Sequence, residues 1–132
     1  MLTRKQAREQ AFILIFEKCF KEETVDEILE LAVEFREFET DDYTINTFKG
    51  VYENVELLDS KISENTKKWD INRISRVSLA ILRLALYEIL FVDEIPVSVS
   101  ANEAVELAKK YSTENDAAFV NGVIGSITRS EG

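Results

Sequence analysis

The stretch LAILRLALYEILFV, residues 79–92, decides the fold that this sequence predicts. Apolar residues cover nearly every side of the helix it would form, which is typical of a helix buried at the centre of a domain. Arg83 and Glu88 interrupt the stretch, so it falls short of the roughly 20 apolar residues that span a bilayer. Because charged side chains are rarely buried alone, we expect each of these two to pair with a residue of another element.

Helix-forming residues also dominate the sequence on both sides of this stretch. The 132 residues include one proline and four glycines, and no segment alternates between apolar and polar residues as a strand does. The pattern predicts an all-α, compact domain of six or seven helices. Two residue pairs, Thr3 with Gln6 and Ser100 with Glu103, have the spacing of an N-terminal capping box. We predict helices over about residues 3–20, 25–38, 42–64, 75–92, 97–111 and 116–127.

The composition excludes several classes of functional site. The chain has no histidine and a single cysteine, Cys19, so it lacks the residues for an internal disulfide, the usual zinc sites and Cys–His or Ser–His catalytic pairs. It also contains no phosphate-binding glycine loop and no secretory signal. We therefore expect a protein that is not an enzyme, carries no metal or cofactor, and works away from membranes in the reducing cytoplasm.

The formal net charge of −9 hides a local excess of basic residues at the start of the chain. Residues 1–20 carry four basic and two acidic residues, whereas residues 21–70 carry six basic and fifteen acidic ones. On a helix, Arg4, Lys5 and Arg8 fall within an arc of about 100° that continues the apolar stripe. These cations should therefore lie at the rim of the core. There they either pair with acids of the following acidic segment or bind phosphates.

A second basic cluster lies in KKWDINRISR, residues 67–76. Basic residues beside an aromatic ring can hold a nucleic-acid strand through phosphate contacts and stacking. We favour a simpler interpretation of Trp69, as a core-filling residue of a connecting loop, and leave the role of the cations open. These cations are Lys67, Lys68, Arg73 and Arg76.

The segment FVNGV, residues 119–123, places a glycine inside a predicted helix. Glycine at such a position costs about 0.5–1 kcal/mol relative to alanine, so its presence needs a reason. Close packing of two helices is one explanation. The other is that Asn121 and Gly122 form a face that admits the backbone of another molecule.

Four segments together resemble one family, the bacterial transcription antitermination factor NusB. They lie in the family's order and at roughly its spacing, and they are TRKQAREQA (3–11), AILRLALYEI (80–89), IPVSVSANEAVELAKKY (95–111) and FVNGVIGSI (119–127). The resemblance implies two packed three-helix subdomains, here about residues 1–70 and 71–132, and no enzymatic activity. It also implies binding of the boxA element of ribosomal RNA leader transcripts together with ribosomal protein NusE. That pair starts an antitermination complex on RNA polymerase.

The resemblance also implies roles for individual residues. The family's basic N-terminal motif matches residues 4–8, diluted here by Thr3 and Gln6, and a family aromatic that can meet a base matches Phe119. The alternative for Phe119 is a role in the hydrophobic core. The negative charge of Asp116 would be unfavourable beside phosphates. The expected RNA contacts are Arg4, Lys5, Arg8, Arg76, Phe119 and Asn121. The expected partner surface lies near Ser78 and Glu88.

Two alternatives to this function stay open. One is a helical protein–protein adaptor whose N-terminal cations are only structural. The other is a NusB-like module related to the N-terminal domains of ribosomal RNA cytosine methyltransferases. Homodimerisation that masks the basic ridge is a further alternative that the sequence does not settle.

Overall fold

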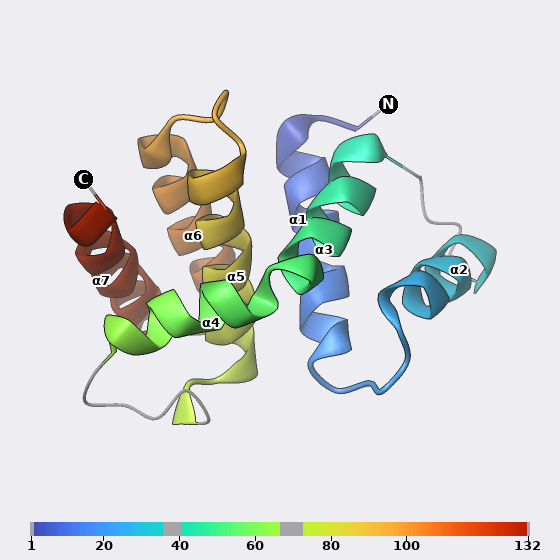
Figure 1. Ribbon diagram of the computed structural model, residues 1–132, viewed down its shortest axis with the longest axis horizontal. Coiled ribbons are helices and arrows are strands. Elements are labelled where there is room, and N and C mark those ends of the chain that lie inside the picture. Colours follow the sequence, from blue (N-terminus) through green and yellow to red (C-terminus); the bar gives the residue numbers. More distant parts are fainter. Residues whose placement is uncertain (1, 36–40, 67–72, 132) are drawn as a thin grey trace.

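The computed structural model describes residues 2–35, 41–66 and 73–131, and every regular element within these ranges is a helix. The helices are α1 (Arg4–Lys18), α2 (Val25–Phe35), α3 (Asp42–Glu53), α4 (Val55–Glu64), α5 (Arg76–Phe91), α6 (Val97–Tyr111) and α7 (Glu114–Glu131). In Figure 1, α5 stands between α6 and α7 on one side and α1 and α3 on the other. The predicted all-α fold is confirmed. Within the described ranges, no helix is long and apolar enough to cross a membrane.

Helix α5 is the centre of the fold. It contacts α1, α3, α4, α6 and α7, and its Ile81, Leu82, Leu84 and Leu86 are buried almost completely. Each side chain of this size contributes roughly 1.5–3 kcal/mol when it is fully buried. These residues belong to one continuous core that takes members from every helix. The prediction of a central buried helix over this stretch is confirmed, whereas the division into two subdomains stays a prediction.

Side-chain caps explain where several helices begin. The carboxylate of Asp41 accepts a hydrogen bond from the Thr44 N–H at 3.2 Å and caps α3, and the Ser75 hydroxyl accepts one from the Ser78 N–H at 3.1 Å and caps α5. By contrast, the capping box predicted at Ser100 is wrong. Helix α6 begins at Val97, directly after a proline, and Ser100 lies buried inside its second turn.

The helix predicted over residues 42–64 is two helices that meet at Asn54. The Asn54 side chain donates a hydrogen bond to the Gly50 carbonyl at 2.8 Å and so competes with the backbone bonds that would continue α3. Gly50 leaves room for Tyr87, because an added Cβ atom would overlap the hydroxyl end of that side chain. The lack of a Cβ atom at Gly50 lets α3 approach α5 closely.

Arg83 and Glu88, the two charged residues within the apolar stretch of α5, both pair with other helices, as predicted. Arg83 donates from Nε and from its second terminal nitrogen to the two carboxylate oxygens of Asp59, each at 2.8 Å. This bidentate pair ties α4 to α5. Glu88 binds α1, α3 and α6 and belongs to the candidate site.

Candidate nucleic-acid interface

A capping box fixes the start of α1. The Thr3 hydroxyl accepts a hydrogen bond from the Gln6 N–H at 3.0 Å, and the Gln6 side chain accepts one from the Thr3 N–H at 2.9 Å. The predicted box is therefore present and places Arg4 and Lys5 in the first turn. Positive charge is unfavourable at this end of a helix dipole. The two cations are therefore not explained by the stability of α1 itself.

Arg8 lies one turn further along α1 and is buried against Glu88. Its Nε donates to the Glu88 carboxylate at 2.8 Å, and both side chains are almost completely shielded from solvent. The same carboxylate accepts hydrogen bonds from the hydroxyls of Tyr43 on α3 and Ser100 on α6, the latter at 2.8 Å. Burial and the hydrogen bond to Glu88 raise the pKa of Tyr43, so its phenol stays protonated and keeps donating. One carboxylate thus joins four helices.

This arrangement buries three of the predicted site residues, whose roles stay predictions. Arg8 is not available to phosphates, because it sits over the core on the same stripe as the buried Phe12 and is held by an acid. Ser78 and Glu88 are each only 1% exposed, so neither presents itself at a partner surface. Among the residues that the structure describes, Arg4, Lys5 and Arg8 meet acids of α5, of α6 and of the loop between them.

The two first-turn cations of α1 stay on the surface. The Arg4 guanidinium lies 4.0 Å above the ring of Tyr43, and one of its nitrogens is 3.9 Å from a carboxylate oxygen of Glu94. The Lys5 amine is 3.1 Å from the Glu103 carboxylate. Both cations are therefore exposed, and each is positioned by a weak surface ion pair. Exposed cations at defined positions can bind anions.

A cleft of about 150 Å³ separates α1 from α6 and continues this rim. Within it the Lys110 amine and the Tyr111 hydroxyl both bind one carboxylate oxygen of Glu9. The hydrogen bond from Lys110, followed by the one from Tyr111, lowers the pKa of Glu9. A third exposed cation, Lys110, is thus anchored on the cleft that Lys5 also lines.

An aromatic row leads from this cleft along α1. The ring of Tyr111 lies 5.0 Å from that of Phe12, the next contact joins Phe12 to Phe16 at 5.9 Å, and the last joins Phe16 to Phe20 at 5.1 Å between centroids. Phe20 is 61% exposed. The sequence carried a signal for this row in the i, i+4, i+8 spacing of the three phenylalanines, and our sequence analysis missed it.

The row ends on a cation of α5. The Arg76 guanidinium lies 5.1 Å from the centre of the exposed Phe20 ring. Arg76 and Arg4 are therefore at opposite ends of α1, which is about 22 Å long at 1.5 Å per residue. Arg73, the preceding cation of the second basic cluster, is also exposed. Its other members, Lys67, Lys68 and Trp69, lie outside the described residues.

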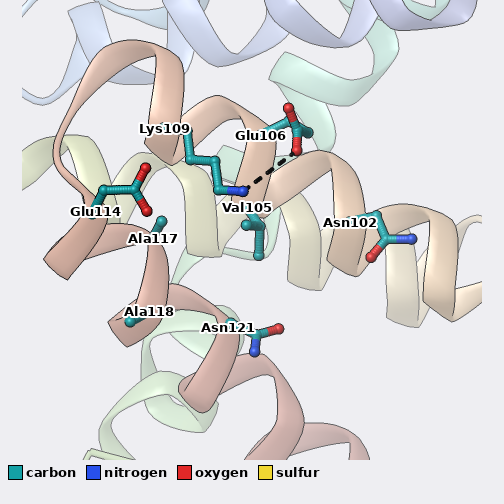
Figure 2. A pocket seen from close by; sticks show the side chains of 8 residues that line it. All are labelled: Asn102, Val105, Glu106, Lys109, Glu114, Ala117, Ala118 and Asn121. Atoms are coloured by element: carbon teal, nitrogen blue, oxygen red, sulfur yellow. Dashed lines mark ion pairs between the residues drawn. The ribbon is translucent and has the colours of Figure 1, made fainter.

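Phe119 and Asn121 of α7 do not form a single site. Phe119 is partly buried and lines a cavity at the start of α5, together with Arg73 and Ser78. Asn121 instead lines an open groove of about 540 Å³ between α6 and α7, which Figure 2 shows. Residues two apart on a helix point to nearly opposite sides, so Phe119 and Asn121 line different hollows, and their roles as RNA contacts stay predictions. A Cβ atom added at the exposed Gly122 would meet nothing within 4 Å, so close helix packing does not explain this glycine.

The whole chain is similar to known proteins of one kind. A family model described as the NusB family matches residues 5–129. The transcription antitermination protein NusB of Clostridium acetobutylicum is 47% identical over 131 residues, which cover 98% of this chain and 97% of that protein. A solved structure of NusB from T. maritima has a TM-score of 0.87 at 35% identity, over 97% of this chain and 92% of that one.

A second solved structure contains additional molecules. It is described as the antitermination factors NusB and NusE in complex with double-stranded RNA. Its matching chain has a TM-score of 0.86 at 28% identity, over 96% of each chain. The similarity therefore extends over nearly the full length in sequence and in structure alike.

Proposed function

The chain belongs to the NusB family, and we propose that it is a transcription antitermination factor that binds the boxA element of ribosomal RNA leader transcripts. The proposal includes ribosomal protein NusE as the partner, because a similar chain has been solved with NusE and RNA. It also places the protein in the cytoplasm, on RNA polymerase. Its action there is binding rather than catalysis.

The observation that carries the RNA surface is the aromatic row with cations at both ends. Arg4 and Lys5 lie at one end of α1, Lys110 lies beside the first ring, and Arg76 lies on the last. Phe12 in the middle of the row is buried, so the stacking faces for bases are those of the exposed Tyr111 and Phe20, and the cations beside them take phosphates. A strand of RNA laid along α1 would meet both kinds of group in turn.

The acids beside these cations do not prevent RNA binding. Ion pairs between exposed side chains contribute only about 0–1 kcal/mol each, so exchanging a carboxylate for a phosphate costs little. Arg4 with Glu94 and Lys5 with Glu103 are pairs of this kind, with long, exposed basic side chains. Before RNA arrives, the acids hold the cations near the positions that phosphates would occupy.

A salt titration tests the proposal. Labelled boxA-type RNA and a scrambled RNA are titrated with the protein, with and without NusE, at several salt concentrations. Each phosphate contact to a single strand contributes about 0.7 to the slope of log affinity against log salt, so Arg4→Ala with Lys5→Ala should lower the slope by about 1.4. Lys49→Ala, an exposed lysine of α3 that pairs with Asp26, is the matched control and should leave the slope unchanged.

Two results would count against the proposal in different ways. Equal affinity for boxA and scrambled RNA in both protein states would leave the adaptor alternative, in which the α1 cations serve only their acidic partners. An unchanged slope in the double variant, with boxA still preferred, would remove this RNA surface and keep the function.

A further inference from the structure

The ring of Tyr43 is the surface on which Arg4 rests. The central carbon of the Arg4 guanidinium lies 4.0 Å from the centre of this ring, well within the roughly 6 Å over which a cation is attracted to an aromatic face. The acid that pairs with Arg4, Glu94, is 3.9 Å away and 75% exposed, so it holds the guanidinium only weakly. Tyr43 therefore does more than Glu94 to fix where Arg4 lies.

Two hydrogen bonds fix the position of the Tyr43 ring. The Tyr43 hydroxyl donates to the buried carboxylate of Glu88 on α5. The next residue, Thr44, donates from its hydroxyl to the Ala7 carbonyl of α1 at 3.0 Å, and this bond fastens the first turn of α3 to the helix that carries Arg4. The ring is thus held in place relative to α1 by bonds that do not involve the Arg4 side chain.

The bond to Glu88 also suits the Tyr43 ring to a cation. A phenol that donates to a carboxylate becomes richer in electrons, and the negative face of an aromatic ring is what attracts a cation. Burial and the same bond raise the pKa of Tyr43, so the phenol keeps its proton and goes on donating at neutral pH. The buried Glu88 carboxylate therefore acts on Arg4 through the tyrosine between them.

An arginine that is held by its flat face keeps its hydrogen-bond donors for a ligand. The five N–H groups of a guanidinium lie in its plane, so a ring against the face does not use them. The carboxylate of Glu94, at 3.9 Å, is beyond hydrogen-bond distance of Arg4. Two of these donors can bind two oxygens of one phosphate. Because the side chain is already ordered, RNA binding loses less conformational entropy than it would with an unsupported arginine.

We propose that Tyr43 is a positioning residue of the RNA surface, which holds the Arg4 guanidinium where it binds a phosphate of the RNA backbone. The inference rests on the proposed function and deepens it, because it assigns a role in RNA binding to an uncharged, partly buried side chain. It also gives a reason for the cation in the first turn of α1, where the helix dipole is unfavourable to positive charge.

Two variants at one position test the inference. Tyr43→Phe and Tyr43→Leu both lose the hydrogen bond to Glu88, but only Tyr43→Leu loses the ring. The affinity of the full chain for a boxA-type RNA is measured at low salt with NusE bound. Tyr43→Leu should bind about fivefold more weakly than Tyr43→Phe, equivalent to about 1 kcal/mol. Tyr87→Leu, at a partly buried tyrosine of α5 whose ring contacts Phe91, is the matched control and should leave the affinity unchanged.

A double-mutant cycle separates positioning from a structural role. In an Arg4→Ala background, Tyr43→Phe and Tyr43→Leu should differ in affinity by less than about twofold, because no guanidinium remains to be held. If Tyr43 acts only through the fold, the difference between its two variants persists in that background. Thermal midpoints of all the variants establish that each is folded at the temperature of the titration.

The outcomes separate the inference from the proposed function. Equal affinities of Tyr43→Phe and Tyr43→Leu for boxA RNA would overturn the positioning role and leave the RNA function standing, and so would a difference that persists without Arg4. An unchanged boxA affinity in Arg4→Ala alone would overturn the inference as well. If the wild type binds boxA and scrambled RNA equally, with and without NusE, the proposed function falls and this inference falls with it.

Discussion

Replacing Glu88 with leucine should destabilise the protein more than any other single change at a charged residue. Leucine nearly fills the volume of the glutamate, so the change leaves little empty space and acts mainly on charge. It leaves Arg8, which is 5% exposed, without its partner at 2.8 Å, and it removes the acceptor for Tyr43 and Ser100. Four helices lose their common contact.

The magnitude follows from the burial of the pair. Breaking a buried ion pair by removing one partner costs about 3–5 kcal/mol, because the remaining charge stays desolvated. Glu103 lies 3.9 Å from Arg8 and is partly exposed, so it offers some compensation and places the expected loss near the lower value, about 3 kcal/mol. Domains of this size are stable by about 5–15 kcal/mol, so the variant should fold but unfold at much lower urea concentration.

Urea unfolding, followed by the circular dichroism signal of the helices, measures the change in the free energy of unfolding. Glu106→Leu, at an exposed acid of α6, is the matched control and should shift the free energy of unfolding by less than about 0.5 kcal/mol. Adding Arg8→Met to Glu88→Leu should restore much of the loss, because no buried charge remains. A loss below about 1 kcal/mol for Glu88→Leu alone would refute the reasoning that Arg8 and Glu88 are a buried, mutually dependent pair.

Four further predictions address other parts of the molecule. Gly50→Ala should lower the free energy of unfolding in urea by about 1–3 kcal/mol, because its Cβ atom would overlap the Tyr87 hydroxyl. Gly122→Ala, whose Cβ atom would meet nothing within 4 Å, should raise it by about 0.5–1 kcal/mol. Equal effects of the two variants would contradict the packing argument. Phe20→Ala should weaken RNA binding by about 1–3 kcal/mol at nearly unchanged thermal midpoint, and an unaltered affinity in an RNA titration would remove Phe20 from the interface. Glu103→Gln should tighten RNA binding at low salt, because Lys5 loses its competing carboxylate, and weaker binding in the same titration would show that the acid instead positions the lysine. Burial raises the pKa of both Tyr43 and Tyr52, so the unfolded chain releases these protons first; the free energy of unfolding should fall as pH rises above about 10, and a flat urea midpoint between pH 9 and 11 would contradict this.

The sequence predicts the helices well where a local rule decides them. The capping box at Thr3 and the caps at Asp41 and Ser75 are local features, and the apolar residues of α5 are dense enough to identify a buried helix without any tertiary information. The break at Asn54 is harder to predict, because an asparagine within an otherwise helical pattern ends a helix only in some settings.

The candidate site is predictable only in part, because partners come from distant segments. Helical spacing correctly places Arg4, Lys5 and Arg8 on one stripe, yet it does not tell which of them the core covers. Glu88 lies 80 residues from Arg8, and only the packing of α1 against α5 brings them together. The same holds for the cavity at Ser78, whose lining joins the starts of two helices about 40 residues apart.

The RNA footprint on the protein tests the central claim most directly. Chemical-shift changes in the isotope-labelled protein, recorded during titration with boxA-type RNA, report which residues meet the strand. We expect the largest changes in a continuous path from Arg4 and Lys5, past Tyr111 and Phe20, to Arg76. Changes concentrated on α2 or in the α6–α7 groove around Asn121, with that path unaffected, would contradict it.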